Sequence, residues 1–499
     1  MDSITQIIQG FSVVLEPVNL MYCFIGVIFG TVVGVLPGLG PTATIALLLP
    51  VTYVIPPEAA IIMLAGIYYG AMYGGSTTSI LMDLPGEAAS VITCYDGYQM
   101  ARQGRAGAAL GISAIGSFIA GTIALVGLTF IAPPLAAIAI RFGPPEFFAI
   151  AVLGLMLVGS LSGGSPVKGM VSAAGGLLLA CIGQDPVYGT LRFSFGIIEL
   201  SGGLEFAALA MGLFGVAEII YNYEHTETGR RIAAKLTDLW PTLQDWRQAR
   251  WAVLRGSIIG FVIGVLPGGG AVISSLMAYA VEKRVAKDPS RFGKGAIEGV
   301  AAPEAANNAA AGSSFIPLLT LGIPANSVMA MMYAALLLHG VQPGPFMLAE
   351  HPALFWGVID SMYIGNIILL ILNLPLVGVF VQLLKLRYSI LAPIAILISL
   401  VGVYSINNST FEIGVILFFG VLGYLMRKFS YDTGPMVLAF VLGPIMEKAF
   451  RQSLLMSNGS FTIFVERPIS LSILALVVFL LVLQLYRTMT HKRQLPLAG

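Results

Sequence analysis

Apolar residues follow one another in long runs along most of this 499-residue chain, and short polar segments separate the runs. A run of about 20 apolar residues can cross the hydrocarbon core of a bilayer as a helix. Besides two interrupted runs, the pattern predicts apolar spans at residues 106–132, 147–162, 169–183, 204–222, 353–384, 389–404, 411–425, 434–446 and 469–486. We therefore predict an all-α polytopic membrane protein with about 11 transmembrane helices and two further hairpins.

Two hydrophobic stretches are interrupted by nearly the same string of residues. Gly34–Gly40 reads GVLPGLG, and Gly264–Gly270 reads GVLPGGG. Irregular backbone at membrane depth is tolerated where it is buried in protein or lines a cavity, so paired breaks of this kind point to a transport site. The chain is therefore expected to be duplicated, with a broken helical hairpin at residues 18–56 and another at residues 252–282.

The arms of both hairpins have roughly fifteen to twenty residues. At 1.5 Å per residue, the shorter arms fall below the ~20 residues needed to cross ~30 Å of hydrocarbon. Re-entrant hairpins are therefore expected, and full-length tilted crossings are the alternative.

Basic residues are distributed unevenly along the chain. No Lys or Arg precedes Arg102, whereas residues 223–251 and the segment after residue 282 are rich in them. Because cytoplasmic loops collect Lys and Arg, the N-terminus is expected outside, residues 223–251 form a cytoplasmic linker, and the C-terminus lies inside. The two hairpins then enter from opposite faces, which predicts two inverted-topology repeats at residues 1–222 and 252–499. Lys448 and Arg451 conflict with this topology, because the number of spans before them places these basic residues on the outer side of the membrane.

The composition supports a membrane protein and gives no sign of catalysis. With 57% hydrophobic and 10% charged residues, the chain differs from soluble proteins, in which about 25% of residues are charged. The net charge of +1 gives no indication of nucleic acid, and no basic signal-peptide region begins the chain. The three cysteines are expected as small packing residues. No metal cluster, HExxH motif or paired nucleophile and base is visible, so no catalytic residue, metal or cofactor is predicted.

Each half carries a second polar cluster after its hairpin. Residues 74–79 read GGSTTS and precede Leu84-Pro-Gly86, whereas Asn307, Asn308 and Ser313-Ser precede Gly322-Ile-Pro324. Hydroxyls and amides supply neutral donors and acceptors, a helix N-terminus favours a carboxylate, and unwound carbonyls favour a cation. These clusters therefore suit an anion bound together with a coupling cation. The alternative is that the hydroxyls bond to their own helices and the small residues serve close packing.

Acidic residues near the membrane are candidates for ion or proton pathways. Glu304 lies beside both asparagines and is the one to test first. The remaining candidates are expected mostly at membrane boundaries: Asp83, Glu87, Asp96, Glu205, Glu218 and Asp360. No Lys or Arg is expected in mid-membrane, so helix dipoles and hydroxyls would hold any anion.

Five ordered motifs together resemble one known family. They are Gly34–Pro41, Tyr73–Ile80, Tyr95–Gly104, Gly264–Gly270 and Asn307–Pro324. Over roughly residues 15–450, the chain is similar to the large membrane (permease) subunit of the tripartite tricarboxylate transporters, the TctA family. Two departures are Asp83, where this family often has Asn, and Ala325, where Gly is common.

The resemblance implies a bacterial secondary transporter of the inner (cytoplasmic) membrane that imports tricarboxylates or related organic carboxylates by symport with sodium or protons. It implies two partners, a small membrane subunit and a periplasmic substrate-binding protein. A self-sufficient carboxylate/cation symporter without a binding protein is the alternative. One central site is expected to alternate between the two faces, with elevator-type sliding of a transport domain against a scaffold as one way to do so.

The candidate site residues come from the hairpin tips and the polar clusters. The expected substrate contacts are Gly38, Gly40, Thr42, Thr44, Ser76, Thr77, Thr78, Gly268, Gly270, Ser274, Ser313 and Ser314. The expected contacts of the coupling ion are Ser79, Asn307, Asn308 and Glu304. The Asp96–Arg102 stretch is expected to be a structural cytoplasmic turn.

Overall fold

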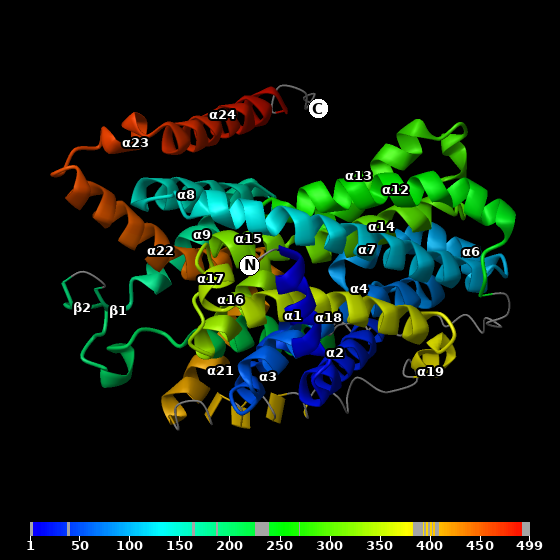
Figure 1. The fold of residues 1–499 in the computed structure, drawn as a ribbon, viewed down its shortest axis with the longest axis horizontal. Coiled ribbons are helices and arrows are strands. Elements are labelled where there is room, and N and C mark those ends of the chain that lie inside the picture. The colour runs from blue at the N-terminus through cyan, green and yellow to red at the C-terminus, as the bar shows by residue number, and fades with distance from the viewer. Residues whose placement is uncertain are drawn as a thin grey trace, which may run out of the picture. The chain divides into compact units, whose positions relative to one another are not determined.

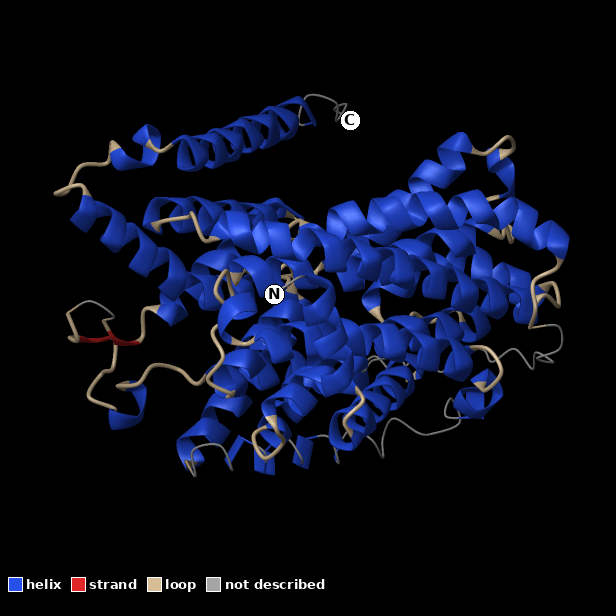
Figure 2. Ribbon diagram, in the orientation of Figure 1, coloured by secondary structure: helices blue, strands red, loops and turns tan. Residues whose placement is uncertain are grey.

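Helices make up nearly all of the regular structure (Figure 2). The computed structural model describes residues 3–36, 40–161, 165–185, 188–224, 239–268, 270–382 and 409–491, with residues 393, 396–397, 400–401 and 403–404 between the last two ranges. Within this part of the chain the strands are β1 (Gly183–Gln184) and β2 (Leu191–Arg192), which form one antiparallel pair. The prediction of a helical membrane protein is confirmed.

Several helices are long and apolar enough to cross a bilayer. Among the described residues six meet both conditions: Pro17–Val35, Pro57–Met82, Ala106–Ala139, Phe206–Glu224, Pro352–Asn373 and Thr410–Lys428. Shorter apolar helices occur at Pro41–Thr52, Pro144–Leu157, Pro166–Ala180, Ser327–Leu338 and Pro468–Val482. The chain is thus a multi-pass membrane protein, and the total of about 11 spans stays a prediction. More than half of the expected span 389–404 and much of the 223–251 linker lie outside the described residues.

The chain forms two compact units, the first made of residues 1–140 and 204–434. The described elements of this unit are helices, some of them labelled in Figure 1. They are α1 (Ser3–Val14), α2 (Pro17–Val35), α3 (Pro41–Thr52), α4 (Pro57–Met82), η1 (Ala88–Ser90), α5 (Val91–Thr93), η2 (Cys94–Tyr98), α6 (Gln99–Arg102), α7 (Ala106–Ala139), α10 (Phe206–Ala210), η4 (Met211–Val216), α11 (Ala217–Glu224), α12 (Leu243–Val265), α13 (Gly270–Val285), η5 (Pro289–Arg291), α14 (Glu298–Ser313), α15 (Phe315–Leu321), α16 (Ser327–Leu338), α17 (Met347–Glu350), α18 (Pro352–Asn373), α19 (Val377–Val381) and α21 (Thr410–Lys428). The predicted repeats at 1–222 and 252–499 both contribute to this unit, and their boundaries stay a prediction.

The two predicted hairpins are present as helix pairs, α2 with α3 and α12 with α13. Proline stands at the start of α2, α3 and α4. A proline at the first helical position has the required φ and removes an N–H that would have no helical partner. The sequence therefore fixes where the chain resumes a helix after each turn in the first half.

The first arm of each hairpin packs on a buried helix through a row of glycines. A side-chain carbon added to any of these glycines would collide with the neighbouring backbone. In α2 the row faces Met63, Ile67 and Ala71 of α4, and in α12 it faces Ala302, Ala306 and Ala310 of α14. The glycines are Gly26, Gly30 and Gly34 in α2 and Gly256, Gly260 and Gly264 in α12. Small residues four apart let two helix backbones approach closely, so both hairpins are held by the same packing.

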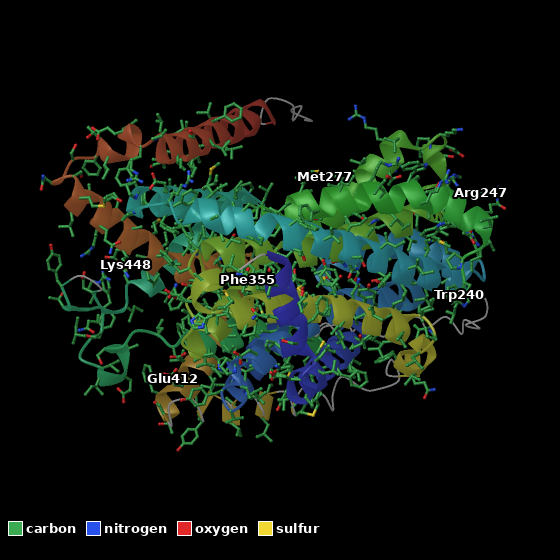
Figure 3. All side chains as sticks on the ribbon, in the orientation of Figure 1. Trp240, Arg247, Met277, Phe355, Glu412 and Lys448 are labelled. Carbon is green, nitrogen blue, oxygen red and sulfur yellow. The ribbon has the colours of Figure 1, made fainter. Side chains whose placement is uncertain are left out.

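Helices α4 and α14 form the centre of this unit. All residues from Ala59 to Met82 in α4 and from Gly299 to Ser313 in α14 are buried. Helix α7 packs along α14, and α18, which carries the fully buried Phe355 labelled in Figure 3, packs on α4. The polar side chains within these two buried stretches are consequently enclosed by protein.

Asp96 fastens the turn that follows α13 to the first half of the chain. Its Oδ1 atom accepts hydrogen bonds from the backbone N–H groups of Gly293, Gly295 and Ala296 at 2.8–2.9 Å. Its Oδ2 atom accepts one from the Tyr279 hydroxyl at 2.9 Å. Asp96 is fully buried, so its position at a membrane boundary does not leave it exposed. Its contacts agree with the expected structural turn.

The second unit consists of residues 141–203 and 435–499. Its helices are α8 (Pro144–Leu161), α9 (Pro166–Ala180), η3 (Ile198–Leu200), almost all of α22 (Gly434–Met456), α23 (Ile463–Glu466) and α24 (Pro468–His491). Arg451, one turn after the labelled Lys448 (Figure 3), pairs with Asp185 at 3.0 Å and Glu447 at 2.7 Å. The two acidic partners compensate the positive charge of Arg451. This compensation is a physical reason why a basic residue can stand on the side that the topology predicts to be outside.

Candidate functional site

Each half has a helix that ends in a left-handed residue and a proline break. Helix α4 ends at Asp83, whose φ is +57°, and α15 ends at Gly322, whose φ is +69°. This conformation costs a residue other than glycine roughly 1 kcal/mol, and aspartate is among the residues that tolerate it best. Pro85 and Pro324 follow at equivalent places, 239 residues apart, as Asp83 and Gly322 are.

A polar side chain caps the helix that resumes after each break. The Glu87 carboxylate accepts a hydrogen bond from the Ala89 N–H at 2.5 Å and caps η1. The Asn326 amide oxygen accepts one from the Met329 N–H at 2.9 Å and caps α16. Glu87 and Asn326 are again 239 residues apart. The same local structure thus ends in a carboxylate in one half and in a neutral amide in the other.

The two caps are bonded crosswise to the central helices of the opposite halves. The Asn307 amide nitrogen donates to Glu87 at 3.0 Å. The Asn326 amide nitrogen donates to the Tyr68 hydroxyl at 3.3 Å. Tyr68 and Asn307 are themselves 239 residues apart. Each half therefore supplies a central helix to one contact and a capping residue to the other.

Both hairpin tips lie against the break in the second half. The Gly268 N–H donates to the Ala325 carbonyl at 2.7 Å. The hydroxyls of Thr42 and Ser327 lie 3.3 Å apart. In addition, α3 packs on α16, and α13 packs on η1. The N-termini of α3 and α16, each 12 residues long, therefore meet at a pair of hydroxyl groups beside the second tip. Such termini offer free N–H groups and partial positive charge.

Two buried carboxylates lie in one polar cluster, here called the carboxylate cluster: Ser76, Glu87, Thr93, Glu304 and Asn307. Glu304 accepts hydrogen bonds from the hydroxyls of Ser76, at 2.5 Å, and Thr93. Glu304 is fully buried and Glu87 is 6% exposed. Within the described residues, neither carboxylate has a basic side chain at ion-pair distance. A buried charge of this kind needs a proton or a cation to compensate it.

The carboxylate cluster contains an oxygen with unused bonding capacity. Within the described residues the Asn307 amide oxygen is buried and has no hydrogen-bond partner. Nearby, the hydroxyls of Ser79 and Ser90 are bonded to each other at 2.9 Å. The groups available as ligands in this cluster are therefore oxygen atoms, which suit sodium or a proton. A site of the kind formed by three or more His, Cys, Asp or Glu side chains is not found among the described residues.

The structure brings together some of the predicted site residues. Ser76, Ser79, Asn307 and Glu304 lie in or beside the carboxylate cluster, and Gly40, Thr42, Gly268 and Gly270 lie at the tips. Asn308 donates to Ser117 of α7 at 2.7 Å and to the Glu304 carbonyl at 3.1 Å. Its amide oxygen, like that of Asn307, is buried and has no hydrogen-bond partner within the described residues. Gly38 lies outside the described residues.

Most of the remaining predicted hydroxyls bond to backbone. Thr44, Ser274, Ser313 and Ser314 each donate to a carbonyl of their own helical segment three or four residues earlier, and Thr78 donates to the Val35 carbonyl. Thr77 is buried. These bonds correspond to the structural alternative for membrane hydroxyls, although a hydroxyl that donates to backbone still has acceptor capacity. Their roles stay predictions.

Sequence reasoning placed Glu87 and Asp360 mostly at membrane boundaries; both are buried inside the protein, and their depth in a membrane stays a prediction. It also passed over Thr93, Asn326 and Ser327. Burial depends on which helices cover a segment, which local charge patterns do not reveal. Alignment of Pro85 with Pro324 in the sequence could have identified Glu87 and Asn326, because it places these two residues at equivalent positions.

The chain was compared with known proteins. The profile of the family described as "Tripartite tricarboxylate transporter TctA family" matches residues 20–438. An uncharacterized 52.8 kDa protein in the TAR-I ttuC' 3'region of Agrobacterium vitis is 50% identical over 494 residues, which cover 99% of this chain and 98% of that protein. An uncharacterized protein in the TAR-II ttuC' 3'region of the same organism is 49% identical over 234 residues, 47% of this chain and 97% of that protein. No solved structure matches significantly.

Proposed function

Because the chain belongs to the tripartite tricarboxylate transporter TctA family, we propose that it is the large subunit of a secondary transporter that imports an organic carboxylate. Its expected partners are a small membrane subunit and a periplasmic substrate-binding protein. Its expected place is the bacterial inner membrane, with a periplasmic N-terminus and a cytoplasmic C-terminus. Family membership and the apolar helices support this proposal.

The substrate carboxylate is proposed to bind where α3 and α16 begin. The observation that carries this assignment is the 3.3 Å contact between Thr42 and Ser327, which brings two helix N-termini together at the hairpin tips. Hydroxyl donors, free backbone N–H groups and two helix dipoles favour an anion at one point. Gly268 and Gly270 border the same place and allow close approach of the backbone.

The coupling cation, sodium or a proton, is proposed to bind at the carboxylate cluster. Glu87 and Glu304 would supply negative charge, and the hydroxyls and the Asn307 amide would supply neutral oxygen atoms. The absence of a basic partner within ion-pair distance among the described residues supports this role, because an intramembrane carboxylate needs a compensating charge. The anion would then bind at the break capped by Asn326, and the cation at the break capped by Glu87.

The halves are proposed to be inverted-topology repeats that move as an elevator. The support is the constant offset of 239 residues between the left-handed ends, the prolines, the caps and the crossed hydrogen bonds. Opposite flanking charges suggest that the hairpins enter from opposite faces. Sliding of a transport domain would expose the shared site alternately.

The test is uptake of citrate, succinate and benzoate into proteoliposomes that contain the large and small subunits, under an imposed sodium or proton gradient. We expect one carboxylate to accumulate only when the cognate binding protein and one gradient are present. Accumulation without the binding protein would favour the self-sufficient symporter. No accumulation of any organic acid under either gradient would contradict a carboxylate transporter.

A further inference from the structure

Two ion pairs join α11 to α21 near the first hairpin tip. Glu218 pairs with Arg427 at 3.2 Å, and Glu224 pairs with Lys428 at 3.1 Å. The pairs have the same charge arrangement and lie about two turns of α11 apart. They differ in surroundings, because the side chains of Glu218 and Arg427 are 14% and 29% exposed, whereas those of Glu224 and Lys428 are 44% and 46% exposed.

Of these two pairs, the one formed by Glu218 faces the hairpin tip. A side-chain carbon added at Gly40 would lie 3.9 Å from both carboxylate oxygens of Glu218. Gly40 is the N-cap of α3, whose second helical residue is Thr42. The Arg427 guanidinium, which also lies over the Tyr221 ring, pairs with the same carboxylate. One carboxylate of the chain is thus close to both a cation and the start of α3.

This arrangement has the chemistry of a carboxylate-binding position. The N-terminus of a helix favours an anion through its free N–H groups and its dipole. Arginine binds carboxylates through a planar fork of N–H donors. In the conformation described, Glu218 pairs with the arginine and lies beside the N-cap of α3. A bound organic acid would need the same two groups, so Glu218 and the substrate would compete for them.

We propose that Glu218 acts as an internal substitute for the substrate carboxylate and that Arg427 is the specificity-determining residue that both of them bind. This inference rests on the proposed carboxylate transport at the α3 and α16 N-termini. Loading of substrate displaces Glu218 from Arg427 and frees the hairpin tip from α11. The measured affinity for substrate is lowered by this competition, since part of the protein has the position filled by Glu218.

The experiment measures citrate binding to the purified full-length chain through the rise in its unfolding temperature with citrate concentration, at constant ionic strength. The variants are Glu218→Gln and Arg427→Gln, with Glu224→Gln and Lys428→Gln as matched controls from the other ion pair. If the inference is right, Glu218→Gln binds citrate about 10-fold more tightly and Arg427→Gln at least about 10-fold more weakly, whereas both controls stay within about twofold of the unmodified chain.

The outcomes separate this inference from the proposed function. Failure of the unmodified chain and of Glu218→Gln to bind citrate, succinate or benzoate contradicts both. Binding by the unmodified chain, with Glu218→Gln no tighter than Glu224→Gln, overturns the inference alone. If Arg427→Gln does not give folded protein, Arg427→Lys keeps the charge and loses the fork; citrate binding by this variant equal to that of the unmodified chain also overturns it.

Discussion

Asn307 and Glu87 are joined by a 3.0 Å hydrogen bond between residues 220 positions apart in the sequence. The bond between Asn326 and Tyr68 repeats it with the halves exchanged. Of these four side chains only Glu87 carries a carboxylate. The two equivalent breaks therefore present an acidic cap in one half and a neutral cap in the other, which is consistent with the proposed separate positions for a cation and an anion.

Replacement of Asn307 by alanine should abolish gradient-driven uptake and lower stability. It leaves Glu87 with one donor fewer in a buried place, which costs about 1–3 kcal/mol. Thermal unfolding of the purified chain and proteoliposome uptake check both effects. Ser275→Ala is the control, because its hydroxyl donates to Ala271 of its own helix; it should lower stability by about 1 kcal/mol or less and leave uptake unchanged. Normal uptake by Asn307→Ala would remove Asn307 from the site.

The repeated GVLPG strings predicted two interrupted helix pairs, which the structure contains, because glycine and proline breaks are local signals. The long apolar runs predicted the helical membrane fold, and the duplication into inverted repeats stays a prediction. The crossed contacts were harder to predict. Asn307 was a candidate because two adjacent amides in an apolar segment need partners. Glu87 was predicted near a membrane boundary. Its burial could not be predicted from the sequence, because it depends on the packing of the distant helices α13 and α14. The paired hydroxyls of Thr42 and Ser327 likewise require knowledge of how the hairpin tip returns to the break.

Substitution of Gly30 by alanine should destabilise the chain by about 1–3 kcal/mol through overpacking. A Cβ atom at this position would collide with the backbone of Gly66 and Ile67. Gly414 of α21 is the control, because a Cβ there would meet no atom within 4 Å, and Gly414→Ala should stabilise the helix by about 0.5–1 kcal/mol. Unfolding temperatures in detergent distinguish the two. Equal effects would contradict close packing of α2 on α4.

Asp245 makes the stability of the start of α12 depend on pH. Burial raises the pKa of Asp245, but hydrogen bonds from Thr242 and the charge and hydrogen bond of Arg105 outweigh it, so the pKa lies below its ordinary value. A lowered pKa stabilises the folded chain above the unfolded-state pKa of about 3.9, and the contribution is lost as the pH falls through the folded-state value.

The matching experiment compares unfolding temperatures of the unmodified chain and Asp245→Asn between roughly pH 3 and pH 7. The variant should be less stable at pH 7, and the two curves should approach each other as the pH falls. A difference that stays constant over this range would show that the charge of Asp245 is not the cause.

Glu304→Gln should separate substrate movement from its driving force. The substitution removes one of the two carboxyl groups in the carboxylate cluster while keeping an oxygen that can accept from Ser76 or Thr93. If Glu304 holds the coupling ion, accumulation of citrate under a gradient should fall by about 10-fold or more, whereas exchange of external for internal citrate should persist. Glu298→Gln on the same helix is the control, because Glu298 pairs with Arg291 at 2.6 Å, and it should keep accumulation within about twofold. Unchanged gradient-driven accumulation by Glu304→Gln would show that the ion is bound elsewhere, and loss of both accumulation and exchange would indicate a role in the substrate site itself.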